Sequence, residues 1–244
     1  MQLARSLLFT ILFYVNTAGQ LILFSYILFL PQETGWAYVR RWSKSNMWLL
    51  DKVVGVKSKI IRTERIPKGP LLIAAKHHST WETFALLPEF RYPTYILKRE
   101  LKFIPVFGWF TTKFRMIPVH RGKGAKALED MTKLAIEELA RDRQIIIFPE
   151  GTRKNADADP AYKTGVARLY RDFGVTCLPI ALNSGRSWPR KSSILYPGTI
   201  TAEILEPIEP GLDQSEFMAL LDERIEKATN RLLQRDDCAA FRSG

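Results

Sequence analysis

The first thirty residues are far more apolar than the rest of the chain. No charged residue occurs from position 6 to position 32, and residues 7–30 are mostly Leu, Ile, Phe, Tyr and Val. About 20 apolar residues suffice to cross a bilayer as a helix. A polar stretch at 16–20 interrupts the run, so the pattern allows one tilted span or two shorter segments within one leaflet. A buried core helix is an alternative, and a cleaved signal peptide is disfavoured because the apolar run resumes at Leu21.

Residues 36–52 combine aromatic and basic side chains. Three of the six tryptophans fall there, together with four Arg or Lys residues. Indole rings favour the headgroup level of a membrane, and cationic side chains meet anionic lipid there. The pattern predicts an amphipathic helix that joins a membrane anchor to the following domain, although a helix packed on that domain fits it as well.

Beyond about residue 58 the hydrophobic pattern becomes that of an α/β domain. Apolar strand-like runs alternate with amphipathic helical patterns, which predicts a mixed, mostly parallel central sheet flanked by helices. The predicted strands are 71–76, 94–98, 115–119, 144–148, 176–182 and 201–205, and the predicted helices are 82–87, 126–141, 165–173 and 215–233. We therefore expect three parts: an N-terminal membrane-associated helical motif (1–57), an α/β domain (58–234) and a C-terminal tail (235–244).

The composition narrows the choice of partner. The chain has 36 basic and 25 acidic residues, a formal net charge of +11, which favours an anionic membrane, a nucleic acid or a phosphate-bearing substrate. No zinc finger or RNA-binding aromatic motif occurs, so we expect no nucleic-acid partner. The two cysteines, Cys177 and Cys238, lie far apart, which excludes a disulfide scaffold and a cysteine-rich zinc module.

Candidate chemistry follows the first predicted strand, where His77 and His78 precede Glu82. Loops that leave strand ends in α/β sheets commonly carry reactive groups. If His77 lies in the loop and Glu82 in the following helix, the chain can fold back and place the carboxylate on one ring nitrogen. That contact would fix the tautomer and leave the other nitrogen to accept a proton.

Two other interpretations use the same residues. Ser79 and Glu82 have the spacing of a helix capping box, a role that does not exclude contact with His77. A metal site built from both histidines and Glu82 is disfavoured because the chain lacks the HExxH spacing, and we expect no metal. The chain has no GxSxG motif and neither cysteine has a nearby histidine. A base at His77 would therefore act on a substrate hydroxyl or on water, without a covalent enzyme intermediate.

A second group of residues, 150–153, follows the predicted strand 144–148. Gly151 permits a tight turn there, and Arg153 offers a fork of donors suited to phosphate. Lys98 and Arg121 stand at the ends of two other predicted strands. Each is by itself an ordinary surface charge, but together they would form a phosphate site if they converge on one edge of the sheet.

Four segments, in order along the chain, resemble the four motifs of the glycerolipid acyltransferases. They are His77-x4-Glu82, Ile-Pro-Val-His-Arg at 117–121, Phe-Pro-Glu-Gly-Thr-Arg at 148–153 and Leu-Pro-Ile at 178–180. The likeness covers roughly residues 35–235 and is greatest to bacterial members that acylate 1-acyl-sn-glycerol 3-phosphate (lysophosphatidic acid). Glu82 stands where most members have aspartate. The N-terminal anchor is similar to the family's two-helix membrane motif, which favours an interfacial hairpin.

This resemblance implies transfer of an acyl group from acyl-CoA or acyl-acyl carrier protein to the sn-2 hydroxyl of the acceptor, which gives phosphatidic acid. It implies no cofactor and a place at the bacterial inner membrane. If the anchor spans, the basic residues after it favour the cytoplasmic side for the acyltransferase domain, although Arg5 weakens that signal. His77 would be the general base and Glu82 its orienting partner. The implied substrate-binding residues are Lys98, Arg121, Glu150, Gly151, Thr152 and Arg153. The alternatives are a related acyltransferase with another lysophospholipid or glycerol 3-phosphate as acceptor, a thioester hydrolase, and a non-enzymatic membrane-binding module.

Overall fold

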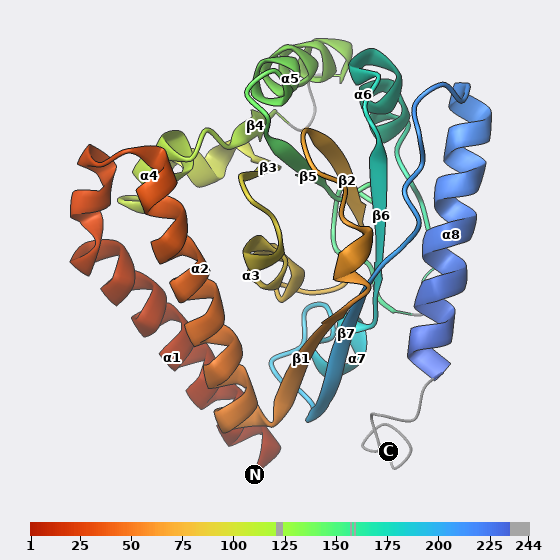
Figure 1. Ribbon diagram of the computed structural model, residues 1–244. Coiled ribbons are helices and arrows are strands. Elements are labelled where there is room, and N and C mark those ends of the chain that lie inside the picture. Colours follow the sequence, from red (N-terminus) through yellow and green to blue (C-terminus); the bar gives the residue numbers. More distant parts are fainter. Residues whose placement is uncertain (121–123, 157, 159, 235–244) are drawn as a thin grey trace.

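The computed structural model describes residues 1–120, 124–156, 158 and 160–234, and its sheet has the predicted class (Figure 1). The strands form one sheet in the order β1-β7-β6-β2-β5-β3-β4. From β6 to β4 all neighbours run parallel, whereas β7 runs antiparallel to β6 and parallel to β1. The strands are β1 (Val56–Ile61), β2 (Leu71–Ala75), β3 (Pro93–Lys98), β4 (Ile117–Val119), β5 (Gln144–Ile147), β6 (Cys177–Leu182) and β7 (Gly198–Ile204). The prediction of a mixed, mostly parallel sheet is confirmed.

Helices cover both faces of this sheet, as Figure 1 shows. The α-helices are α1 (Gln2–Leu23), α2 (Gln32–Leu49), α3 (Glu82–Ala85), α4 (Phe107–Lys113), α5 (Gly124–Leu139), α6 (Gly165–Phe173), α7 (Ser184–Ser187) and α8 (Gln214–Gln234). Short 3-10 helices are η1 (Ser25–Phe29), η3 (Thr63–Arg65), η4 (Leu87–Glu89) and η5 (Arg99–Phe103), and η2 (Leu50–Val54) is a turn of π-helix.

The six predicted strands correspond to β2–β7, but β1 was not predicted. Its sequence, Val-Lys-Ser-Lys-Ile-Ile, carries three polar side chains, and among the described residues it pairs only with β7, at the edge of the sheet. An edge strand buries less apolar surface than a central one, so its hydrophobic pattern is weak. The predicted boundary at 57/58 falls inside β1. The predicted tail, 235–244, lies outside the described residues, as does Cys238.

Alternating side chains along the strands build two cores. Ile73 and Ala75 of β2 belong to the core shared with α1, α2 and α3, whereas Leu72 and Ala74 belong to the core shared with α5, α6 and α8. Side chains alternate between faces along a strand. Two consecutive residues beyond the end of β2 therefore face opposite sides of the sheet, which matters for the site described below.

The polar stretch that interrupts the N-terminal apolar run does not end the helix. α1 continues through it, and the amide of Asn16 donates to Ser45 Oγ (2.9 Å) and Asn46 Oδ1 (3.0 Å) on α2. The Trp42 indole N–H donates to Thr17 Oγ1 at 3.0 Å. The polar residues thus pair α1 with α2, and the chain turns between them through η1.

The outer surface of α1 is apolar. Exposed side chains on this helix include Leu3, Leu7, Leu8, Ile11, Tyr14, Val15, Ile22 and Leu23. By length and composition α1 is able to cross a membrane, and only 11% of its apolar window is buried within the protein. Its opposite face contributes Phe9, which is fully buried in the same core as Trp36 of α2.

Two tryptophans of α2 provide a matched test of this packing. Trp36 is buried against the Phe114 ring, with the centroids 4.6 Å apart, whereas Trp48 is exposed. We expect Trp36→Ala to lower the free energy of unfolding by about 3–5 kcal/mol, because it opens a cavity in the core. Trp48→Ala should stay within about 0.5 kcal/mol of the parent protein. Denaturant titrations of both variants in detergent measure the difference, and equal losses would contradict the assignment of α2 to the core.

Candidate active site

His77 and Glu82 meet at the end of β2. His77 lies in the loop after the strand, and Glu82 begins α3, as the sequence predicts for a base and its partner. His77 Nδ1 is 3.0 Å from Glu82 Oε1; the histidine side chain is 13% exposed and the carboxylate is fully buried. An ionised carboxylate only accepts hydrogen bonds, so Nδ1 carries the proton of this contact. Nε2 is then the ring nitrogen left to accept a proton.

Four further donors surround the Glu82 carboxylate. Oε1 accepts the backbone N–H groups of His78 and Ser79, both at 2.6 Å. Oε2 accepts the hydroxyls of Ser79 at 2.7 Å and Ser184 at 2.8 Å. The capping contact from the Ser79 N–H and the contact with His77 therefore coexist on one carboxylate.

Glu82 stays ionised despite its burial. Burial alone raises the pKa of this carboxyl, but the contact with His77 and the hydrogen bonds from Ser79 outweigh it and hold the pKa below its usual range. Hydrogen bonds to the charged form of an acid favour that form. A negative charge thus rests permanently beside the His77 ring.

Ser184, which lies 102 residues from Glu82 in the chain, was not predicted as part of the site. It is the first residue of α7, just beyond β6, and β6 is the parallel neighbour of β2. The carboxyl ends of adjacent parallel strands lie at one edge of the sheet. Combined with the pairing of β2 and β6, that rule brings the residues just after the predicted strand 176–182, Ser184 among them, to the loop that carries His77.

Aromatic rings pack against one face of the His77 imidazole. Phe148, the first residue of the third motif, follows β5 and stacks on the imidazole with centroids 3.9 Å apart and an interplanar angle of 13°. Tyr95 of β3 stacks behind Phe148 at 5.9 Å and donates its hydroxyl to the Glu82 backbone carbonyl at 3.1 Å. Three neighbouring strands thus fix the ring and the helix that carries its partner.

Arg153 lies close to the same loop. Its Nη1 donates to Thr80 Oγ1 at 2.9 Å, and both Arg153 and Thr152 are exposed. The turn depends on Gly151, which has φ +67° and against which the Lys163 side chain packs. The third motif is therefore folded back onto the first, and the Arg153 side chain stays exposed to solvent.

The other predicted phosphate contacts are less closely tied to His77. Lys98 ends β3 with a half-exposed side chain, and its Nζ is 3.7 Å from Glu100. Arg121 lies outside the described residues; the preceding His120 contacts Arg99.

Glu150, predicted to bind substrate, is buried in an internal ion pair. Lys76 Nζ is 2.8 Å from Glu150 Oε1 and 2.6 Å from Glu226 Oε1 of α8. Burial raises the pKa of Glu150, and the opposing effect of Lys76 does not fully offset it. Lys76 thus faces α8 while the next residue, His77, faces α3. A contact of Glu150 with substrate stays a prediction.

His78 is a buried neighbour of the site. Its side chain is fully buried, and neither ring nitrogen has a hydrogen-bond partner among the residues described. Burial is the main reason that its pKa falls from 6.5 to about 4, so the ring is neutral at pH 7. Within the described ranges no group of three or more His, Cys, Asp or Glu residues is arranged to hold a metal ion.

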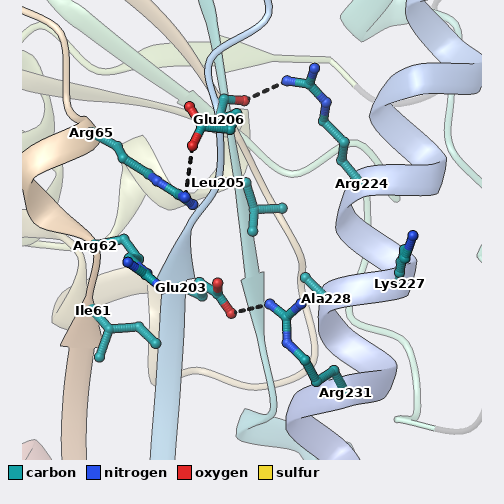
Figure 2. Close-up of a pocket in the computed structure, with 10 residues that line it drawn as sticks. All are labelled: Ile61, Arg62, Arg65, Glu203, Leu205, Glu206, Arg224, Lys227, Ala228 and Arg231. Carbon is teal, nitrogen blue, oxygen red and sulfur yellow. Dashed lines mark hydrogen bonds and ion pairs between the residues drawn. The ribbon is translucent and has the colours of Figure 1, made fainter.

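A groove of about 570 Å³ lies apart from these residues (Figure 2). It opens between α8 and the carboxyl ends of β1 and β7, and ion pairs within it join Arg65 to Glu206 and Arg231 to Glu203. Leu205 in its lining belongs to the core on the α8 side, opposite the face to which His77 points. The groove is therefore separate from the candidate site.

The buried His78 ring predicts a pH-dependent stability. The folded-state pKa of about 4 lies below the unfolded value of 6.5, so the unfolded chain binds the proton more readily. The contribution is present above pH 6.5 and is lost as the pH falls towards 4, by about 3 kcal/mol in total. We expect His78→Leu to lose less stability than the parent protein between pH 7 and pH 4.5 in denaturant titrations. Identical pH slopes would show that His78 is not buried in its neutral form.

Comparison with known proteins agrees with the motif pattern. Residues 57–183, slightly more than half of the chain, match the family model described as Acyltransferase. The chain is 32% identical to a 1-acyl-sn-glycerol-3-phosphate acyltransferase of Pseudomonas aeruginosa, across 89% of this chain and 87% of that protein. It is 25% identical to a lyso-ornithine lipid O-acyltransferase of the same organism, across 71% and 73% of the two chains.

The fold also matches a solved structure. The crystal structure of the 1-acyl-sn-glycerophosphate (LPA) acyltransferase PlsC from Thermotoga maritima aligns with a TM-score of 0.80 and 24% sequence identity, covering 96% of this chain and 99% of the other. That likeness includes the N-terminal helices as well as the sheet. The motif order, the family model and the Pseudomonas relative agree, and this chain belongs to the acyltransferase family.

Proposed function

We propose that this acyltransferase transfers an acyl group from a thioester donor to the sn-2 hydroxyl of 1-acyl-sn-glycerol 3-phosphate, forming phosphatidic acid. The observation that carries the proposal is the His77–Glu82 contact, with Nδ1 held at 3.0 Å by a buried carboxylate and Nε2 left free to accept a proton. The names of the Pseudomonas relative and of the Thermotoga structure favour this acceptor.

In the proposed reaction His77 is the general base. Nε2 takes the proton of the acceptor hydroxyl while the hydroxyl oxygen attacks the thioester carbonyl. The new C–O bond forms, the C–S bond breaks, and the imidazolium returns its proton to the departing thiolate. Glu82 stabilises the imidazolium and fixes the tautomer. No acyl-enzyme intermediate is needed, because the acceptor itself is the nucleophile.

The surroundings of Glu82 suit this role. Its four donors apart from His77 keep the carboxylate charged and prevent its rotation. The stack with Phe148 restricts the imidazole from the other side. A base that is already oriented requires little rearrangement at the moment of reaction, and a positioned base typically accelerates a reaction by about 10²–10⁴-fold.

Cationic side chains supply the phosphate recognition. Arg153, which bonds to Thr80 three residues beyond the base, is the principal candidate for the acceptor phosphate. Lys98 and Arg121 are further candidates, and the Gly151–Thr152 turn would present backbone groups to the same phosphate. The donor is acyl-CoA or acyl-acyl carrier protein; both are anionic, which suits a chain of net charge +11.

The acceptor and the product are both lipids, and the proposed location follows from that. The exposed apolar face of α1 would bury itself in a membrane, where a tightly paired α1–α2 hairpin can sit in one leaflet. We propose the bacterial inner membrane, with the sheet on the cytoplasmic side where the thioester donors are.

A second acceptor is favoured by one specific observation. The relative named lyso-ornithine lipid O-acyltransferase matches 71% of this chain, and the acceptor in its name contains ornithine. An acyl-transfer assay in detergent, with radiolabelled acyl-CoA and acyl-acyl carrier protein as donors, separates the candidates. Its acceptor panel comprises lysophosphatidic acid, lyso-ornithine lipid, other lysophospholipids and glycerol 3-phosphate.

Each result of the assay has a distinct meaning. Thiol release that requires lysophosphatidic acid supports the proposed function. Release that requires another acceptor assigns that acceptor instead, and release without any acceptor indicates a thioester hydrolase. The absence of turnover with every pair, from protein that is folded and bound to vesicles, would leave only a membrane-binding module.

Removing the proposed base provides the first mutational test. We expect His77→Ala to lower kcat by about 10²–10⁴-fold, because the substitution removes the imidazole that accepts the hydroxyl proton. Its thermal stability and vesicle binding should remain close to those of the parent protein. Near-normal turnover in this variant would falsify the base assignment.

The role of Arg153 is tested against a matched arginine. Loss of a hydrogen bond to a charged group costs about 1.5–3 kcal/mol, so Arg153→Ala should raise KM for lysophosphatidic acid roughly tenfold or more. The effect should be smaller with monoacylglycerol, which lacks the phosphate. Arg171→Ala on α6, exposed and paired with Asp172, removes the same charge elsewhere and should change KM little. Equal effects of the two variants would remove Arg153 from the phosphate site.

A further inference from the structure

Exposed apolar side chains outside the N-terminal helices are concentrated in one short segment. After residue 48, the described chain exposes five large apolar side chains: Phe103, Ile104, Trp109, Leu134 and Ile136. Three of them lie within residues 103–109, where Phe103 is 72% and Trp109 is 62% exposed. A soluble surface rarely gathers apolar groups in this way unless they meet a partner.

The backbone of this segment is tightly folded. Val106 has φ +62°, a conformation that a β-branched residue rarely adopts. A Cβ at Gly108 would clash with the Lys102 carbonyl oxygen, and the Gly108 N–H donates to the Ile104 carbonyl at 2.7 Å. The exposed rings are therefore presented by a defined turn. Backbone strain of this kind persists only where the surrounding structure maintains it, and it is found disproportionately at functional segments.

The segment adjoins the apolar N-terminal hairpin. α4 contacts η1, the turn between α1 and α2, and both lie at the same end of the hairpin (Figure 1). The Gln32 amide donates to the Lys113 carbonyl at 3.2 Å, and the Lys113 ammonium donates to the Leu30 carbonyl. Phe29 in η1 is itself almost fully exposed. The C-terminal end of α4 is thus joined to the turn of the hairpin, and the exposed apolar residues at 103–109 lie at and just before the other end of this short helix.

Basic side chains accompany these rings. The Arg99 guanidinium lies 5.9 Å from the centroid of the Phe103 ring. In the chain, Lys98 directly precedes Arg99 and Lys102 directly precedes Phe103. Aromatic rings with cationic neighbours suit the headgroup region of an anionic bilayer, where the ring is partly wet and the cation meets lipid phosphate. A protein interface core, by contrast, is depleted in lysine.

We propose that residues 103–109 form a second membrane-contacting element, which inserts Phe103, Ile104 and Trp109 into the headgroup region of the leaflet that holds α1. The partner is an anionic phospholipid surface. This inference rests on the proposed membrane association of α1. Its consequence for the reaction is direct: Lys98 and the end of β3 would lie at the lipid headgroups, where the phosphate of a lysophospholipid acceptor is found.

Two isoleucines provide a matched comparison, since Ile104 and Ile136 are each 46% exposed. Single-cysteine variants Leu8→Cys on α1, Ile104→Cys and Ile136→Cys on α5 are made in a Cys238→Ser background and labelled with an environment-sensitive fluorophore. Cys177 is fully buried and does not compete for the label. The full-length proteins are reconstituted with phosphatidylglycerol-containing vesicles, with and without lipids brominated near the headgroup.

We expect bromolipid quenching at positions 8 and 104 to exceed that at 136 severalfold. If the label at position 8 is quenched but the label at position 104 is quenched no more than that at position 136, this inference is overturned, whereas the membrane association of α1 stands. Lack of quenching at all three positions overturns membrane association itself and this inference with it. The label at position 104 is also measured without vesicles. If it is shielded from water to the same extent there, and the shielding grows with protein concentration, the segment contacts a second copy of the chain and the proposal is overturned.

Discussion

The buried charge of Glu82 is the constraint on which the rest of the site depends. An ionised carboxylate removed from water must be fully paired, or its burial becomes very costly. Here the backbone after β2, the Ser79 hydroxyl, the His77 ring and Ser184 at the end of β6 all converge on its two oxygens. The charge therefore fixes the His77 tautomer and also joins segments of the chain that are distant in sequence.

The alternation of side chains beyond β2 holds the same loop from both faces of the sheet. Lys76 turns towards α8 and is paired with Glu150 and Glu226, while His77 turns towards α3 and stacks on Phe148. The third motif contributes to both, since Phe148 and Glu150 are two residues apart and face opposite sides. The sequence of this motif suggests a single substrate-binding segment, but its residues have three different surroundings. Phe148 packs on the imidazole, Glu150 lies in an internal ion pair, and the Arg153 side chain is exposed.

Local patterns predicted most of the fold and the contact between His77 and Glu82. Strands β2 to β7 and the contact of His77 with Glu82 were predicted because each depends on hydrophobic runs or on residues close in sequence. β1 was missed because an edge strand with three polar side chains lacks that pattern. The Ser184 contact and the burial of Glu150 depend on which strands are neighbours and on where α8 packs. Neither is encoded in the spacing of a motif.

The N-terminal hairpin has two opposite surfaces, and this limits how the enzyme can be simplified. Phe9 of α1 contacts Trp188 with ring centroids 5.5 Å apart, and Phe9, Trp36 and Leu50 belong to the same core as the central strand β2. Deleting the first fifty residues to obtain a water-soluble catalytic fragment would strip one side of that core and favour aggregation. Polar replacements confined to the exposed residues of α1, such as Leu7, would make the outer surface of this helix polar and leave the core packing intact.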